Sequence, residues 1–148
     1  MRNILIIFGP VILMTFLTGC STLTLTTEQT MKEYSRINEK TISNYYDFRL
    51  GLVSAFGGGN QFNNGLKYIY AYNDDNQRCK VVINEKTTLR ITKNDGRKVN
   101  MYFDTSFIKD SCLYGNKSHF INLSAGPFKI TGLKKIEIQT TNDLVSIE

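Results

Sequence analysis

The residue types that carry most enzyme chemistry are scarce in this chain. His119 is the only histidine among 148 residues, so a serine–histidine–aspartate triad would have to use it as the general base. It lies on a segment whose alternation predicts a surface or half-buried strand position, and no serine sits in a Gly-x-Ser-x-Gly elbow. Asp104 and Asp110 are candidates for a carboxylate pair only in the sense that any two acids are. We therefore predict no catalytic residue and no enzymatic activity.

Metal and cofactor sites are not predicted either. Residues 73–76 (Asn-Asp-Asp-Asn) offer oxygen ligands, but they lack the spacing, central glycine and distal glutamate of a calcium loop. Cys79, Cys112 and His119 are too few and too scattered for a zinc site. The glycines at 57–59 are followed by no Gly-Lys-Ser/Thr and by no helix pattern, so we interpret them as a loop and not as a phosphate cradle.

A basic cluster is the strongest functional signal after residue 20. Residues 78–98 contain seven Lys and Arg side chains against two acids, a net charge of +5. Strand alternation places Lys80, Arg90 and Lys98 on the face opposite the apolar residues, and Tyr102 continues that face. If these strands are neighbours, the four residues form a positive stripe that could bind an anionic surface. The alternative is a solvated outer face whose lysines protect the sheet from aggregation.

Alternating apolar and polar residues predict strands over most of the chain. The exception is 27–40, where Met31, Tyr34 and Ile37 recur at helical spacing and Thr27 is placed to cap a helix. We expect that helix to pack on a sheet. Strands are predicted at 46–56, 66–72, 79–83, 89–91, 99–103, 118–123, 128–130, 134–140 and 144–147.

Short polar turns connect several of these segments. The turns at 84–86 and 94–96, the second containing the hairpin signal Asp-Gly, predict an antiparallel meander over 79–103. Residues 104–117 are predicted to be irregular. One helix cannot cover an open sheet of this size, whereas two packed sheets or a closed barrel bury their apolar faces. The predicted fold class is therefore mainly β: an antiparallel β-sandwich or small barrel of about eight strands with one N-terminal helix.

The first twenty residues differ from the rest of the chain. A basic start (residues 1–3) precedes an apolar run of about 14 residues, which suits a signal peptide and falls short of a transmembrane helix. The tetrapeptide that follows, Leu17–Cys20 (LTGC), resembles the lipobox of bacterial lipoproteins. The resemblance implies that residues 1–19 are removed and that Cys20 is acylated. A retained transmembrane anchor and an ordinary secretory signal are the alternatives.

This resemblance also implies a domain organisation and a location. Residues 1–19 would be the signal peptide, 20–27 a lipidated tether and 28–148 a single β-rich domain. The alternation of leucine and threonine in 20–27 could instead add an edge strand. The lipid would anchor the protein to the cell envelope. Ser21 stands where a retention signal in the lipobox family would usually place aspartate, so in a Gram-negative cell the resemblance points to the periplasmic face of the outer membrane.

Export bears on the two remaining cysteines. An exported domain with two thiols most simply pairs them, so we predict a disulfide between Cys79 and Cys112. Closing that loop of about 34 residues would stabilise the fold by roughly 3–4 kcal/mol. Two buried or free thiols are the alternative.

The charge of the mature chain favours some partners over others. Without Arg2, 17 basic and 13 acidic side chains leave +4, which is too little to make nucleic acid the leading partner. An anionic envelope surface or an acidic envelope protein fits better. We therefore predict a membrane-anchored, non-catalytic binding or assembly module without a cofactor. The alternative is a small lipoprotein inhibitor of an envelope-directed hydrolase such as lysozyme.

Overall fold

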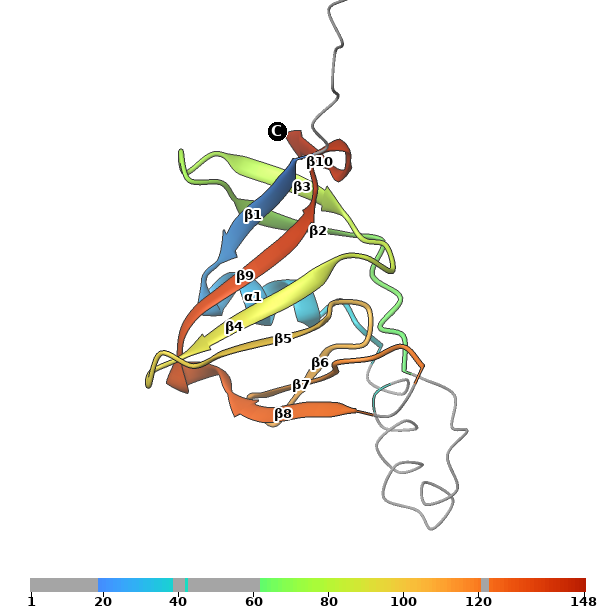
Figure 1. Ribbon diagram of the computed structural model, residues 1–148, viewed down its shortest axis with the longest axis vertical. Coiled ribbons are helices and arrows are strands. Elements are labelled where there is room, and N and C mark those ends of the chain that lie inside the picture. The colour runs from blue at the N-terminus through green and yellow to red at the C-terminus, as the bar shows by residue number, and fades with distance from the viewer. Residues whose placement is uncertain (1–18, 39–41, 43–61, 121–122) are drawn as a thin grey trace, which may run out of the picture.

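The computed structural model describes residues 19–38, 42, 62–120 and 123–148. In this part of the chain the strands form two antiparallel sheets (Figure 1). The large sheet has the order β10-β3-β2-β1-β9-β4-β5 and the small sheet the order β6-β7-β8. The elements are β1 (Cys20–Leu25), α1 (Thr27–Tyr34), β2 (Tyr68–Tyr72), β3 (Arg78–Val82), β4 (Thr88–Lys93), β5 (Lys98–Tyr102), β6 (Phe107–Lys109), β7 (Cys112–Asn116), β8 (Ser124–Lys129), the 3-10 turn η2 (Ile130–Gly132), β9 (Leu133–Thr141), the 3-10 turn η3 (Asn142–Leu144) and β10 (Val145–Ile147).

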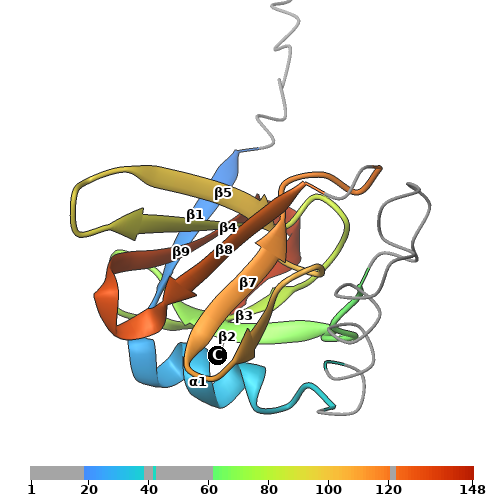
Figure 2. The same ribbon diagram turned by 90° about the horizontal axis from the view of Figure 1, so that it is seen from below.

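The core lies between the inner faces of the two sheets. Ile69, Ile91 and Ile138 from the large sheet share it with Phe107 and Leu113 from the small sheet, and all five are at most 1% exposed. Helix α1 contacts β2 and β6 and closes one side of this core (Figure 2). The predicted mainly-β, sandwich-like class with an N-terminal helix is therefore confirmed.

The first described strand corrects the predicted tether over 20–27. Cys20–Leu25 form β1, which lies inside the large sheet and pairs with β9 from Cys20↔Thr141 to Leu25↔Ile136. The alternation of leucine and threonine explains this placement, because Leu23 and Leu25 are buried while the threonines face outward. Cys20–Leu25 thus belong to the folded sheet and not to a tether.

Helix α1 is shorter than predicted and is capped one residue earlier. Thr26 is the N-cap: its hydroxyl accepts from the Gln29 N–H, and the Gln29 side chain accepts from the Thr26 N–H. The helix ends at Tyr34, whereas the prediction extended it to residue 40. Tyr34 and Ile37 are buried as predicted, but Met31 is 40% exposed.

The predicted meander over 79–103 is only partly correct. β4 and β5 form the expected hairpin around Gly96, whose φ of 83° suits the turn. β3 does not pair with β4, because β2, β1 and β9 lie between them. β3 pairs instead with β2 and with the C-terminal β10.

The segment from 104 to 130 differs most from the prediction. Residues 107–116, expected to be irregular, form the β6–β7 hairpin, whose turn places Asp110 and Ser111 at positive φ. The described residues of the predicted strand at 118–123 are not in a strand, and β8 begins at Ser124. The dipeptide Gly126-Pro127, expected to separate strands, lies inside β8. The predicted strand at 46–56 and the glycine loop at 57–59 fall outside the described residues.

Candidate functional site

The outer face of the large sheet contains all four predicted binding residues. Lys80 and Arg90 lie between buried neighbours on β3 and β4, so their side chains point away from the core. Lys98 and Tyr102 share the corresponding face of β5. We use "outer face" for the outward residues of this sheet: Cys20, Thr22, Thr24, Tyr68, Tyr70, Tyr72, Arg78, Lys80, Val82, Thr88, Arg90, Thr92, Lys98, Asn100, Tyr102, Lys135, Glu137, Gln139, Thr141 and Ser146.

Strand order divides the predicted stripe into two groups. Lys80 is on β3 and Arg90 is on β4, four strand positions apart in the large sheet. At about 4.8 Å per strand, their backbones are separated by roughly 19 Å. Lys80 therefore belongs to one cluster, and Arg90 with Lys98 to another.

The first cluster is a ladder of tyrosines and cations that the sequence analysis missed. The Arg78 guanidinium lies 3.9 Å from the centroid of the Tyr70 ring, and the Lys80 ammonium lies 4.7 Å from that of Tyr68. The Arg36 guanidinium, just after α1, lies 4.5 Å from the centroid of the same Tyr68 ring. The rings of Tyr68 and Tyr70 are 5.6 Å apart, edge to face. We call these five residues the tyrosine–cation ladder.

The sequence contained a signal for this ladder. Tyr68, Tyr70 and Tyr72 alternate with Ile69 and Ala71, and β2 buries the two aliphatic residues completely. The tyrosines are therefore forced onto the outer face. What the alternation does not reveal is that the register Tyr70↔Lys80 and the turn after α1 bring cations over their rings.

The second cluster is built around a buried acid. Glu137 on β9 is 7% exposed and lies opposite Arg90, with 3.4 Å between Oε2 and the arginine Nε. Its Oε1 is 2.9 Å from the Lys135 ammonium. The buried Arg90 Nε makes no hydrogen bond, so the pair is held by charge alone. Glu137 thus neutralises part of the predicted stripe.

The outer face remains positive after this pairing. On the described strands of the large sheet it presents five cations against one carboxylate. The cations are Arg78, Lys80, Arg90, Lys98 and Lys135, and the carboxylate is Glu137. Threonine, asparagine and glutamine fill half of the remaining positions and tyrosine fills four more, so polar groups accompany the cations over this face.

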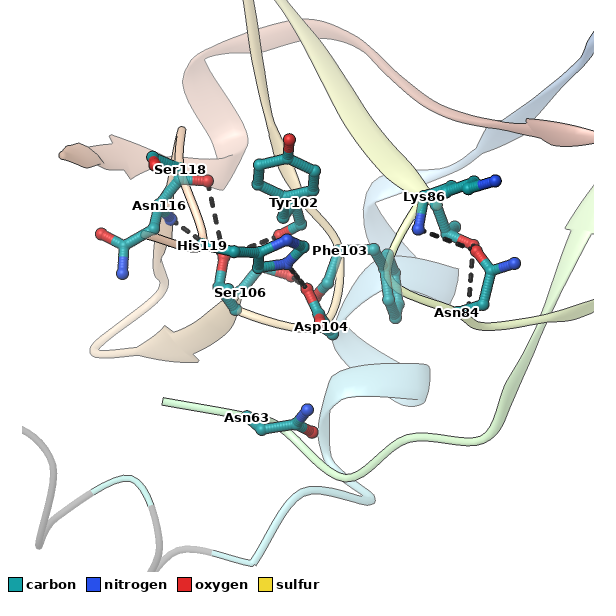
Figure 3. Close-up of polar contacts among 12 residues, drawn as sticks. Asn63, Asn84, Lys86, Tyr102, Phe103, Asp104, Ser106, Asn116, Ser118 and His119 are labelled. Carbon is teal, nitrogen blue, oxygen red and sulfur yellow. Dashed lines mark hydrogen bonds and ion pairs between the residues drawn. The ribbon is translucent and has the colours of Figure 1, made fainter. Parts of the chain in front are cut away.

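Tyr102 belongs to a separate cluster with the single histidine (Figure 3). Its ring stacks on His119, with centroids 3.7 Å apart and planes at 26°. His119 Nε2 is 2.9 Å from Asp104 Oδ1, and both side chains are partly shielded from solvent. The prediction that His119 lies on a strand is wrong, because it follows β7 in an irregular segment.

This cluster joins two of the three groups that could have supported catalysis. Asp110 lies in the exposed turn after β6, whereas Asp104 precedes β6. The nearby buried hydroxyl of Ser106 donates to the Phe103 carbonyl and is bonded to the Tyr34 hydroxyl. The Ser106 hydroxyl is therefore engaged by Phe103 and Tyr34, while Asp104 orients the His119 ring. Sequence reasoning could not find it, because the two residues come from separate irregular segments.

The predicted disulfide between Cys79 and Cys112 is wrong. Both residues are free thiols. Cys79 is buried on β3 in the large sheet, and Cys112 begins β7 in the small sheet, at the other end of the molecule in Figure 1. The two strands belong to different sheets, and no bond joins the two sulfur atoms. Cys20, in contrast, is exposed at the start of β1.

The described residues contain neither a metal cluster nor a membrane-spanning helix. There, no three histidine, cysteine, aspartate or glutamate side chains gather where they could hold a metal ion. Within the same residues, no helix has the length and apolar character needed to cross a membrane. The chain matches no family model, no curated protein and no solved structure.

Proposed function

We propose that this protein is a lipid-anchored component of the bacterial cell envelope that acts by binding and not by catalysis. The lipobox resemblance at Leu17–Cys20 supports the anchor, and the exposure of Cys20 at the start of β1 is compatible with acylation there. In a Gram-negative cell, the proposed location is the periplasmic face of the outer membrane.

The observation that supports a binding role is the composition of the outer face. Five cations and several tyrosines project from rigid strands, where their positions are fixed by backbone pairing. Such a surface suits an anionic envelope surface or an acidic envelope protein. The modest net charge and the proposed location argue against nucleic acid as the partner. The non-catalytic role rests on the single histidine and on the free, unclustered cysteines.

Mass spectrometry and cell fractionation test the anchor. We expect the purified protein to begin at Cys20 and to carry a diacylglycerol thioether, and we expect a Cys20→Ser variant to leave the membrane fraction. An intact Met1, or an unmodified sulfhydryl at position 20, would refute the proposed anchor. Crosslinking of the acylated protein in whole envelopes, followed by identification of the captured partner, tests the binding role.

A specific feature also favours the inhibitor as a second candidate. The β2–β3 hairpin protrudes from the body of the molecule (Figure 1) and exposes Asp74 and Asp75 at its tip. The tip is held in shape by Asn73, which exchanges side-chain and backbone hydrogen bonds with Gln77. An acidic loop of this kind could enter the cleft of a basic lysozyme. Inhibition of lysozyme that is lost in the Asp74→Asn/Asp75→Asn variant would support this candidate, and absence of inhibition by the unaltered protein would reject it.

A further inference from the structure

We propose that the outer face lies against the anionic lipid headgroups of the membrane that holds Cys20. This inference rests on the lipid anchor of the proposed function and commits its binding surface to one target. In this arrangement the tyrosine–cation ladder binds the phosphate groups of the lipids and not a protein partner.

The position of Cys20 brings the outer face close to the bilayer. Cys20 shares the outward side of β1 with Thr22 and Thr24, opposite the buried Leu23 and Leu25. No flexible residues separate it from the sheet, because its backbone already pairs with Thr141 of β9. The strand of six residues is about 20 Å long. An acyl chain on Cys20 therefore keeps the domain close enough to the bilayer for the outer face to reach the headgroups when the sheet lies flat on the membrane.

Charge then selects among the orientations that this anchor permits. If the domain stood upright on the Cys20 end, it would present Asp143 next to the membrane, since the Ser21 hydroxyl, one residue after the anchor, donates to the side chain of the adjacent Asn142. That carboxylate would be repelled by anionic lipids. Tilting onto the outer face instead brings five cations against the already paired Glu137 and against Glu148, which lies beside Arg78 at the edge of the sheet. Electrostatics therefore favours the tilted orientation.

The chemistry of the ladder suits the headgroup region. A guanidinium or ammonium over a tyrosine ring keeps N–H donors for phosphate oxygens. Tyrosine is favoured at membrane interfaces because its ring is apolar and its hydroxyl is polar. Val82, 46% exposed on the same face, pairs with Tyr68 and adds an apolar contact beside the ladder.

Lysine labelling of the full-length acylated protein tests the orientation. The protein is reconstituted on vesicles of phosphatidylcholine alone or of phosphatidylcholine with phosphatidylglycerol, and amine modification is measured by mass spectrometry. We expect Lys80, Lys98 and Lys135 to be labelled about fivefold more slowly on the anionic vesicles, as about 1 kcal/mol per cation implies. Lys117, just after β7, and Lys129, on β8, are both exposed; they are the controls and should not change. High salt should abolish the difference, because the Debye length falls to about 3 Å at 1 M.

A charge-matched pair of variants provides the second measurement. Arg78→Gln/Lys80→Gln removes two cations from the ladder, and Lys117→Gln/Lys129→Gln removes one just after β7 and one from β8. Only the first should restore labelling of Lys135 on anionic vesicles. Equal labelling of Lys80, Lys98 and Lys135 on both vesicle types, or protection of Lys117 and Lys129 in their place, would overturn the inference.

The anchor and the orientation can fail separately. Vesicle flotation and the mass of the Cys20 peptide report whether the lipid is present. If the protein floats with the vesicles and carries the lipid, but lysines are labelled at the same rate on neutral and anionic vesicles, the proposed anchor stands and the inferred orientation is refuted. If no lipid is present on Cys20, the anchor is refuted and the inference falls with it.

Discussion

Replacing Glu137 by glutamine should weaken the fold and strengthen membrane binding at the same time. Glu137 is the single carboxylate among the outward residues of the described large-sheet strands, and it is 7% exposed. Glutamine keeps its shape but gives up the charge that faces Lys135 at 2.9 Å and Arg90 at 3.4 Å. The substitution therefore separates the two properties that an ordinary destabilising mutation would lower together.

The expected loss of stability follows from these two ion pairs. Each is partly shielded from water, so we estimate about 0.5–1 kcal/mol per pair, or about 1–2 kcal/mol in all. The buried Arg90 Nε makes no hydrogen bond, so the negative charge of Glu137 is what compensates its burial. Removing that charge should therefore cost an amount near the upper end of this range. For a folded chain of about 130 residues, this corresponds to a fall in Tm of about 4–8 °C.

The expected gain in binding follows from the charge balance. Removing one negative charge beside an anionic surface contributes about 1 kcal/mol, or about fivefold in affinity. The measurement is cosedimentation with phosphatidylglycerol-containing vesicles in a Cys20→Ser background, where no lipid anchor masks the weaker electrostatic term. Thermal unfolding of the same samples gives the stability.

Asp110→Asn is the matched control for Glu137→Gln. It removes the same charge from the exposed β6–β7 turn, and asparagine tolerates the positive φ of 50° found there. Its binding should stay within about twofold, because charges beyond the Debye length of about 10 Å are screened. Unchanged or weaker binding by the Glu137→Gln variant would refute the role of the outer face. An equal gain from both variants would show that net charge alone controls binding.

Three further predictions concern the core, the thiols and one hairpin. Burial raises the pKa of Tyr34. The stability that its neutral hydroxyl contributes should therefore be lost as the pH rises above about 10, the ordinary pKa of tyrosine. In unfolding measurements, Tyr34→Phe should reduce this alkaline loss and lower the stability at neutral pH by about 1 kcal/mol. Cys79 and Cys112 should both be alkylated in denaturant without a reductant, and a mass that shows them joined would contradict the structure. The Arg97 side chain lowers the pKa of Asp95, so this exposed turn should lose its small contribution only as pH falls through that lowered value, and Arg97→Gln should return the Asp95 carboxyl titration, followed by NMR, to its usual range.

Local patterns in the sequence predicted the directions of side chains well. Lys80 and Arg90 point outward as their alternation indicated, and the Asp-Gly turn at 95–96 forms the expected hairpin. These features depend on residues next to one another, since strand geometry reverses the side chain at every step. The same alternation around Tyr68 was enough to place the tyrosines of the ladder on one face.

Pairings between distant segments were beyond such patterns. The cation–tyrosine contacts of Lys80, the ion pair of Arg90 with Glu137 and the contact between Asp104 and His119 all join residues from separate parts of the chain. The predicted disulfide failed for the same reason, because the count of cysteines says nothing about which sheet each occupies. Residues 20–27 were interpreted as a tether because they are rich in serine and threonine and follow the predicted lipid site. Their alternation allowed an edge strand, but it could not show that β1 lies inside the sheet.

By itself, the sequence determined the mainly-β class, the inward and outward residues of most strands, and the resemblance at Leu17–Cys20 on which the proposed anchor rests. The tertiary structure alone decided the strand order, which separates Lys80 from Arg90 and inserts β1 and β9 between their strands. Side chains alternate because of the local geometry of each strand. Which strands pair depends instead on how much apolar surface the whole chain buries in that arrangement. The entropy of closing a loop rises only by about 0.6 kcal/mol per doubling of its length, so distant strands compete for partners almost as well as near ones.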